Sequence, residues 1–260
     1  MGTTIVGDRI RFDRTTTNID AGCPSRLTPY LEIGPTFFLA AEHLFRDAIR
    51  WRAPVVDLVF PVRGGSVPTD HAYPLYGALS GAVPAFHDAQ QSLRFAPLTG
   101  VRDEAGRLRL APWSRLRVRL PAEAIPNVLP LASRALDVAG ARVALGAPSV
   151  EALVPAPALE SWLVTFKHGE EPAAFLATTR ARLTELGVAG EPAVRAFESG
   201  PRAGEVRRRV VRVSGAAIVG YALLVSGLTA EESIRLQERG LGGRTKIGCG
   251  FFLPHTPRAS

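Results

Sequence analysis

Two consecutive stretches of this chain predict the same order of secondary-structure elements, and this order limits the fold more than any other feature. In the first stretch a β-rich run, Val55–Pro61, precedes a helix over Asp70–Val83 whose Pro74 falls in the first turn, where proline is tolerated. Strands are then expected at 93–98, 107–110 and 114–120, a helix over 121–133, and two strands within 136–154 joined by Gly140. This β-α-β-β-α-β order is typical of a ferredoxin-like domain.

The second stretch repeats the order of elements without repeating the sequence. It predicts a strand at 159–166, a helix over 171–186, two strands at 206–213 and 217–225, a helix over 229–239 and a strand at 250–253. The proline-rich segment Val154–Pro157 is the expected junction. The sequence therefore predicts an α+β protein with tandem ferredoxin-like (RRM-like) domains, at residues 53–157 and 158–260.

Residues 1–52 form an N-terminal extension with a different composition. Met1–Pro35 mixes Thr, Asp, Gly and Pro with short apolar pieces, whereas 36–51 has the periodicity of an amphipathic helix. An accessory extension and a start codon assigned too far upstream both account for this segment. Its sequence does not separate them.

The charge of the chain favours a polyanionic partner. The chain carries a net charge of +7 and has a pI near 10.2, so nucleic acid is a better candidate partner than a membrane surface. Of the 31 basic residues only Lys167 and Lys246 are lysines; arginine suits bidentate phosphate contacts, although a high-GC genome also favours it. No apolar run reaches the roughly 20 residues of a membrane span, so we expect a cytoplasmic protein.

Metal and disulfide chemistry have no support in the sequence. Cys23 and Cys249 are far apart and lack ligand neighbours. The five histidines are His43, His71, His87, His168 and His255, and no pair of them shows metal-ligand spacing beside other donors. We therefore predict no metal site and no cofactor.

The C-terminal segment Leu228–Pro254 has the most distinctive local pattern. Thr229 and Glu232 have capping-box spacing, so a helix should begin there and end at Gly240. The following loop is lean in side chains and basic, which lets backbone N–H groups approach an anion. Its candidate anion-binding residues are Gly240, Gly242, Gly243, Arg244, Lys246, Gly248 and Gly250. On composition alone, a glycine-rich turn that binds nothing is an equally good interpretation.

The order of helix, basic glycine-rich loop and short strand resembles the RNA-processing endonucleases of CRISPR systems, the Cas six family. The run Leu236–Phe252 is similar to that family's glycine loop, closest to the subgroup from myxobacterial-type class I systems, and Asp70–Ser80 is similar to the segment after its first strand. The resemblance begins near Ala53. It implies tandem ferredoxin-like domains, CRISPR repeat RNA as the partner, and other subunits of an interference complex as further candidate partners.

The resemblance also gives His71 a catalytic role. A helix entry favours a neutral imidazole beside a phosphate, as a general base requires, but on local grounds alone a structural histidine fits better. The family commonly uses a histidine after its first strand in catalysis. The implied reaction needs no metal, because the RNA's own 2′-hydroxyl attacks the adjacent phosphate and leaves a cyclic phosphate. Lys167 is the preferred candidate to stabilise the phosphoryl charge, ahead of Tyr73 and Tyr76.

Two arginine-rich strands are further candidate RNA contacts. Arg115, Arg117 and Arg119 alternate with apolar residues and share one face of the strand at 114–120, and Arg207 and Arg209 share a face within 206–213. Neither stretch contains an acidic residue, so like charges should gather without partners. This favours an RNA backbone contact over a merely solvated sheet face.

The leading hypothesis is an endoribonuclease that cuts CRISPR precursor RNA within its repeats to give guide RNAs. Two alternatives stay open: a non-catalytic RNA-binding subunit of a CRISPR ribonucleoprotein, and a ferredoxin-like pair that makes only protein contacts. Cleavage of repeat RNA in EDTA, binding without cleavage, and the lack of salt-dependent RNA binding distinguish the three hypotheses.

Overall fold

The computed structural model of this protein describes residues 2–6, 9–13, 54–88, 92–103, 105–167, 171–197 and 200–256. The chain divides into two compact units, Met1–Trp51 and Arg52–Ser260. In the first unit, β1 (Gly2–Val6) and β2 (Arg9–Asp13) form an antiparallel hairpin. The helix expected at 36–51 lies outside the described residues.

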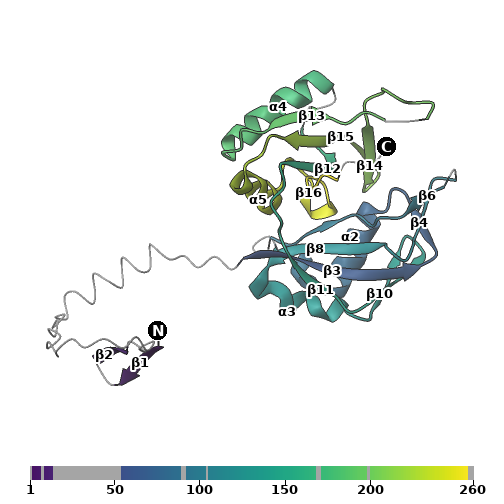
Figure 1. Ribbon diagram of the computed structural model, residues 1–260. Helices are drawn as coiled ribbons and strands as arrows, with labels where there is room; N and C mark the ends of the chain where they lie inside the picture. The colour runs from purple at the N-terminus through teal and green to yellow at the C-terminus, as the bar shows by residue number, and fades with distance from the viewer. Residues whose placement is uncertain are drawn as a thin grey trace. The chain divides into compact units, whose positions relative to one another are not determined.

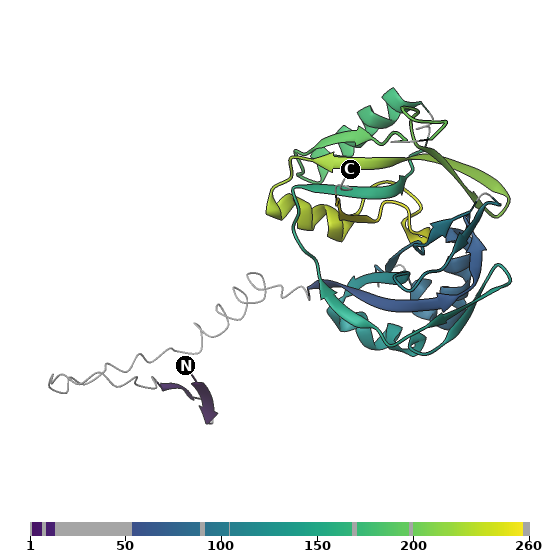
Figure 2. The ribbon, with the colours of Figure 1, turned by 45° about the vertical axis from the view of Figure 1, so that its right-hand side comes forward.

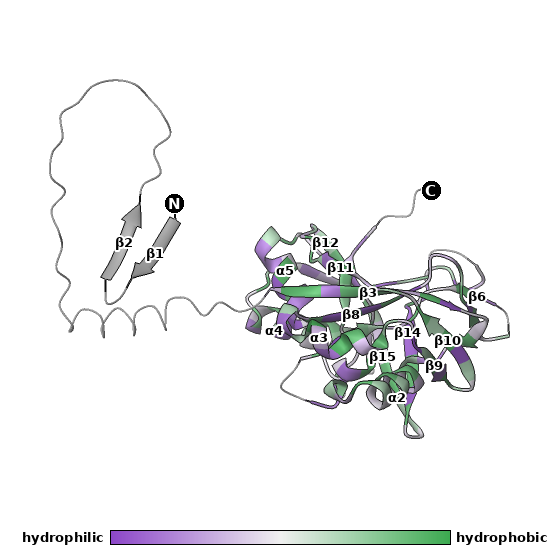
Figure 3. Ribbon diagram, turned by 90° about the horizontal axis from the view of Figure 1, so that it is seen from below, coloured by the Kyte–Doolittle hydropathy of each residue, from purple (hydrophilic) through white to green (hydrophobic). Residues whose placement is uncertain are grey.

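The first half of the larger unit is built on an antiparallel sheet with the strand order β5-β8-β3-β10-β9, and β11 pairs with the start of β3 (Figure 1). The strands are β3 (Val55–Gly64), β5 (Arg94–Ala96), β8 (Arg115–Pro121), β9 (Ala135–Val138), β10 (Ala141–Leu145) and β11 (Ser149–Ala152). The central strand β3 is apolar over most of its length (Figure 3). A small second sheet contains β4 (Ser66–Pro68), β6 (Val101–Arg102) and β7 (Arg107–Arg109) in the order β4-β7-β6.

Helix α2 (Ala72–Ala82) packs Leu75 and Leu79 into the core of this half. The continuous helix predicted over 121–133 is wrong. The segment consists of three short turns: η2 (Ala122–Ala124), α3 (Ile125–Val128) and η3 (Leu129–Leu131). Pro126 and Pro130 cannot donate the backbone hydrogen bonds of a continuous helix, and each lies in the first turn of a new helical piece.

The second half repeats this arrangement with the strand order β13-β15-β12-β16, and β14 also pairs with β15. Its strands are β12 (Ala158–Val164), β13 (Glu191–Val194), β14 (Arg208–Val213), β15 (Ala216–Ser226) and β16 (Phe252–Pro254). Helices α4 (Pro172–Glu185) and α5 (Ala230–Arg239) contribute Phe175, Leu183 and Leu236 to its core. Strand β13 was not predicted, because it is a short edge strand that contains a proline.

The two halves are tandem ferredoxin-like domains, as predicted. In each half the first strand (β3, β12) lies between the third (β8, β15) and the last, and the second strand (β5, β13) lies at the far edge. The predicted capping box is also confirmed, because Thr229 Oγ1 accepts the N–H of Glu232 and the Glu232 carboxylate accepts the N–H of Thr229. No helix in the described part of the chain combines the length and the apolar character needed to cross a bilayer.

A third apolar cluster joins the two halves. It combines α2 residues with Trp162 and Leu163 of β12, Val211 of β14, and Ile247 and Cys249 of the glycine-rich segment. Figures 1 and 2 show this C-terminal segment, in yellow, between the two halves. The short turn η4 (Thr245–Ile247) therefore contacts both α2 and β5.

Candidate active site

His71 lies at the start of α2 and is enclosed by the backbone of its own half. The residue is only 4% exposed. Its Nδ1 lies 2.9 Å from the carbonyl oxygen of Pro68, and the backbone N–H of Leu98 donates to its Nε2 at 2.9 Å. Because Nε2 accepts, Nδ1 carries the hydrogen of a neutral ring. Burial lowers the pKa of His71, which favours the same neutral form.

This environment argues against the predicted catalytic role of His71, whether as the base or as the acid. Both ring nitrogens are satisfied by backbone groups, so neither can reach a 2′-hydroxyl without breaking a buried hydrogen bond. A catalytic base needs a nitrogen within hydrogen-bond reach of the reacting proton. His71 instead ties the start of α2 to the chain at Leu98.

His87 lies beyond the other end of α2 and is exposed. Its Nδ1 is 3.4 Å from the hydroxyl of Tyr76, and the two rings meet edge to face with their centroids 5.8 Å apart. The ammonium group of Lys246 donates to the carbonyl oxygen of His87 at 3.0 Å. Within the described ranges the His87 Nε2 has no hydrogen-bond partner, and the residue is exposed.

Three elements bring these residues together. Tyr76 stands on α2, and Pro84 starts the short turn η1 (Pro84–Phe86) that returns the chain so that His87 faces this helix. Lys246 comes from η4, which is anchored by the buried side chain of Ile247. Tyr76 and His87 therefore come from the first half of the unit and Lys246 from the second.

His87 was not predicted from the sequence. Tyr76 and His87 are eleven residues apart, which on a continuous helix would separate them by about 16.5 Å along the axis, and only the turn at Pro84 brings them together. The available signal was that a second histidine follows α2 in the same β-α-β segment.

The other predicted catalytic candidates lie elsewhere. Lys167 is exposed in the turn after β12, and the described residues include no contact between it and either His71 or His87. The hydroxyl of Tyr73 lies 2.9 Å from the Oγ of Ser214, so it joins α2 to the β14–β15 hairpin.

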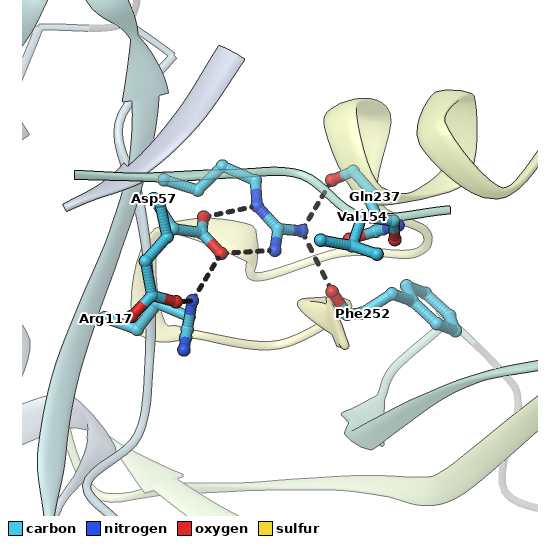
Figure 4. A network of polar contacts seen from close by, with 7 residues as sticks. Asp57, Arg117, Val154, Gln237 and Phe252 are labelled. Carbon is cyan, nitrogen blue, oxygen red and sulfur yellow. Dashed lines mark hydrogen bonds and ion pairs between the residues drawn. The ribbon is translucent and has the colours of Figure 1, made fainter. Parts of the chain in front are cut away.

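The arginine face of β8 is occupied by the protein itself. Arg119 is 1% exposed and forms a two-pronged ion pair with Asp57, with nitrogen–oxygen distances of 2.7 and 2.9 Å. Its Nη1 also donates to the carbonyl oxygens of Gln237 and Phe252, each at 2.9 Å (Figure 4). The prediction that Arg119 binds RNA is therefore wrong, because this side chain links β3 and β8 to α5 and β16.

Its neighbours on β8 are less enclosed. Arg117 pairs with Asp57 at 3.1 Å and with Glu151 at 2.7 Å, so the expected absence of acidic partners is also wrong for this strand. The partners come from β3 and β11, which the sequence of β8 alone could not show. Arg115 donates to the carbonyl oxygens of Pro112 and Ser114, and it stays a candidate RNA contact.

The glycines of the C-terminal loop mainly allow close packing. Four of the five loop glycines already use their N–H groups: Gly240 donates to Leu236, Gly243 to Thr165, Gly248 to Thr245 and Gly250 to Leu163. A Cβ at Gly242 would lie 2.6 Å from the carbonyl oxygen of Thr165, and one at Gly250 would lie 1.9 Å from that of Leu241. The prediction that these glycine N–H groups hold an anion is therefore corrected for these four positions. Arg244 and Lys246 are exposed and remain candidates.

Cys249 is not suited to act as a nucleophile, and no metal-ligand cluster is found among the described residues. Burial raises the pKa of the Cys249 thiol to about 12, so it stays protonated and is no nucleophile at neutral pH. The part of the chain that the structure describes contains no group of three or more His, Cys, Asp or Glu side chains that could share a metal ion.

Comparison with known proteins identifies the family of this chain. The family model described as "Cas6 Crispr" matches residues 56–257. This chain belongs to the Cas6 family. The predicted resemblance is thereby confirmed over both ferredoxin-like halves, and the match does not extend into residues 1–55.

A curated Cas6 relative agrees with this assignment. The CRISPR-associated endonuclease Cas6 of Myxococcus xanthus (strain DK1622) is 47% identical over 199 residues, which cover 76% of this chain and 81% of the relative.

Solved structures share the Cas6 fold at low identity. A CRISPR-associated protein Cas6 has a TM-score of 0.52 and 14% identity, over 78% of this chain and 99% of that protein. The product of a Cas6-related gene from Pyrococcus furiosus has a TM-score of 0.52 and 12% identity, over 77% and 98%. A protein described as a RAMP protein binding different RNA substrates has a TM-score of 0.54 and 12% identity, over 76% and 98%. These similarities concern the fold alone.

Proposed function

We propose that this Cas6 protein cleaves CRISPR precursor RNA within its repeats and so produces guide RNAs. The curated relative is named as an endonuclease, and the net charge of +7 suits an RNA substrate. The observation that carries the proposal is the exposed imidazole of His87, with Tyr76 on one nitrogen and Lys246 on its backbone carbonyl. A positioned imidazole and a nearby cation both promote phosphodiester cleavage by an internal hydroxyl.

The proposed reaction is a transesterification within the RNA. The 2′-hydroxyl oxygen attacks the adjacent phosphorus, the P–O2′ bond forms, and the P–O5′ bond breaks. The products are a 2′,3′-cyclic phosphate and a free 5′-hydroxyl, so neither water nor a metal ion is a reactant.

Each residue has a distinct part in this reaction. The Nε2 of His87 either takes the 2′-hydroxyl proton or protonates the leaving 5′-oxygen, while the Tyr76 hydroxyl at Nδ1 fixes the ring orientation. The ammonium group of Lys246 exchanges the His87 carbonyl for a phosphoryl oxygen and stabilises the negative charge that builds there. His87 replaces His71 in the role that the sequence suggested.

The proposal also covers further RNA contacts, the domain boundary and the cellular location of the protein. Arg244 and Arg115 contact the RNA backbone near this site, and Lys167 stays a secondary candidate. We place the domain junction between residues 157 and 158, where the connection from β11, which ends at Ala152, reaches the start of β12 at Ala158. A protein that processes RNA transcripts is expected in the cytoplasm, where other subunits of an interference complex could join it.

A scan of single 2′-deoxy substitutions through the repeat RNA, with EDTA present throughout, tests this proposal. We expect one position at which the deoxynucleotide abolishes cleavage while the dissociation constant is unchanged, because only the attacking hydroxyl is removed. The upstream product from unmodified RNA should end in a cyclic phosphate.

Three outcomes would overturn the proposal. Cleavage that is lost in EDTA and restored by Mg²⁺ excludes the metal-independent reaction. Cleavage that continues at every deoxy position excludes the 2′-hydroxyl as nucleophile. Binding without any cleavage identifies the protein as an RNA-binding subunit instead.

A further inference from the structure

Three arginines from both halves of the unit gather near the start of α2. Arg102 lies on β6 in the first half, and Arg207 and Arg209 lie immediately before and on β14 in the second half. Arg102 acts electrostatically on both His71 and Arg209, so its charge lies near both residues. We call these three residues the arginine cluster.

Two members of the arginine cluster each carry one buried nitrogen without a hydrogen-bond partner. Arg207 and Arg209 are half-buried, and the Nε atom of each is inaccessible to solvent and has no acceptor. Buried guanidinium donors are normally paired, because leaving a buried donor unsatisfied costs free energy. The described part of the protein therefore supplies no acceptor for these two N–H groups.

The arginine cluster also lacks carboxylate partners. Elsewhere in the second half Arg180, Arg182 and Arg202 each pair with a glutamate, at 2.6 to 2.7 Å. Among the described residues no ion pair within 4 Å is recorded for Arg102, Arg207 or Arg209. Burial, followed by the charges of Arg102 and Arg207, lowers the pKa of Arg209 to about 10.

One acidic residue, Asp70, lies near β14, but it forms no ion pair with the arginine cluster among the described residues. The Oδ2 of Asp70 accepts the backbone N–H of Arg212, and its Oδ1 is buried without a recorded partner. The Asp70 carboxylate is thus directed to the backbone of β14, and no ion pair with the arginine cluster is recorded in the described segments.

Aromatic rings hold two of the guanidinium groups in place. The guanidinium carbon of Arg207 lies 5.5 Å from the ring centre of Phe197, and that of Arg209 lies 5.8 Å from Trp162. Trp162 is itself fixed, because its indole N–H donates to the carbonyl oxygen of Gly248 at 2.7 Å. Arg207 and Arg209 are therefore positioned before any ligand arrives, which lowers the entropic cost of binding a ligand.

We propose that Arg102, Arg207 and Arg209 form a phosphate site, assembled from both halves, that holds one backbone phosphate of the RNA beside the cleavage site. Arginine suits this ligand, since its planar group binds phosphate oxygens through two parallel hydrogen bonds. Tyr76 stands on α2 five residues after His71, about 7.5 Å along the helix axis, so the bound phosphate lies within a few nucleotides of the scissile bond. The identity of the ligand as RNA rests on the proposed function; the binding of a phosphate group does not.

The RNA arm of the test uses repeat RNA made uncleavable by a 2′-deoxynucleotide at the cleaved position. Dissociation constants are measured across KCl concentrations for the wild type, Arg102→Ala and Arg209→Ala. Arg182→Ala is the matched control, because it removes the same charge from α4, where Arg182 pairs with Glu185. We expect each cluster variant to weaken binding about tenfold and to lower the salt slope by roughly one, while the control changes affinity less than about twofold.

The phosphate arm uses inorganic phosphate and the melting temperature. We expect phosphate to raise the melting temperature of the wild type and of Arg182→Ala, but not that of Arg209→Ala. Without phosphate, Arg209→Ala should melt no lower than the control, because it removes an uncompensated charge.

The two arms separate failure of the phosphate site from failure of the proposed function. If the wild type cleaves repeat RNA and the cluster variants bind it as the control does, the phosphate site is wrong and the function stands. If the wild type neither binds nor cleaves repeat RNA, the function fails, and a phosphate shift lost in Arg209→Ala still supports the site. If inorganic phosphate raises the melting temperature of Arg209→Ala as much as that of Arg182→Ala, the phosphate site is wrong.

Discussion

His71 and His87 lie beyond opposite ends of α2, and their ring nitrogens have different partners. The two nitrogens of His71 are both used by backbone groups, whereas His87 is exposed and its Nδ1 lies near the Tyr76 hydroxyl. The sequence predicted that a histidine of this segment takes part in catalysis. It could not indicate which one, because the decisive hydrogen bond comes from Leu98, 27 residues away from His71.

The pH dependence of stability should identify His71 as a buried neutral residue. Its pKa is lowered in the folded protein, whereas the unfolded value is about 6.5. The stabilisation from the neutral ring is therefore complete above about pH 6.5 and is lost as the pH falls from there toward the folded pKa. In His71→Gln the side chain does not titrate, so this loss should be absent.

Urea denaturation between pH 5 and pH 8 measures this effect. At pH 8 we expect His71→Gln to be less stable than the wild type by about 1–2 kcal/mol, because the replacement hydrogen bonds fit less well. Toward pH 5 the difference should shrink. The exposed His87, changed to Gln, is the control and should keep the wild-type dependence. If the stability of His71→Gln depends on pH as that of the wild type does, His71 is not the buried neutral residue that causes this dependence.

At the scale of elements, strand β8 shows how far periodicity predicts structure. The alternation correctly predicts that Leu116, Val118 and Leu120 face the core, and all three are fully buried. It does not predict what covers the opposite face. That face meets α5 and β16 of the second half, which lie more than 110 residues later in the chain, through the hydrogen bonds of Arg119.

Arg119, which pairs with Asp57 in the first half and donates to Gln237 and Phe252 in the second, should carry a large part of the stability of the contact between the halves. In Arg119→Met the Asp57 carboxylate, whose side chain is 3% exposed, loses its two-pronged partner, so we expect a loss of about 3–5 kcal/mol in the free energy of unfolding. Urea denaturation of Arg119→Met and the wild type measures this difference in the free energy of unfolding. Arg115→Ala, on the same face, should cost less than about 1 kcal/mol.

A second variant separates the buried charge from the packing of Arg119. In the double variant Asp57→Leu, Arg119→Met no charge remains buried without a partner, so the loss should be clearly smaller than in Arg119→Met alone. Equal losses in the two variants, or a loss below about 1 kcal/mol in the single one, would contradict this account of the interface.

The glycine-rich loop was predicted as an element but not in its role. Its composition is compatible with anion binding and with close packing, and only the fold distinguishes them. Gly250 has a φ of +65° and its Cα faces the carbonyl oxygen of Leu241, so a side chain there is excluded by the backbone. The sequence does not show which segment packs against a glycine, and this explains the misassigned N–H groups.

At the scale of the whole molecule, the site is composite. Tyr76 and His87 come from the first half and Lys246 from the second, and the arginine cluster also draws on both. The order of elements predicted the two halves because each follows local periodicity. Their mutual packing depends on side chains such as Trp162 and Ile247, whose partners no local pattern reveals.

The most direct test of this account is the single-turnover cleavage rate constant of repeat RNA at saturating enzyme in EDTA, compared between His87→Ala and His71→Gln. We predict a loss of about 10²–10⁴-fold for His87→Ala, since a general acid or base is removed, and a change of less than about threefold for His71→Gln at a temperature where it is folded. A His87→Ala enzyme that cleaves at the wild-type rate, or a folded His71→Gln enzyme that loses as much activity as His87→Ala, would contradict it.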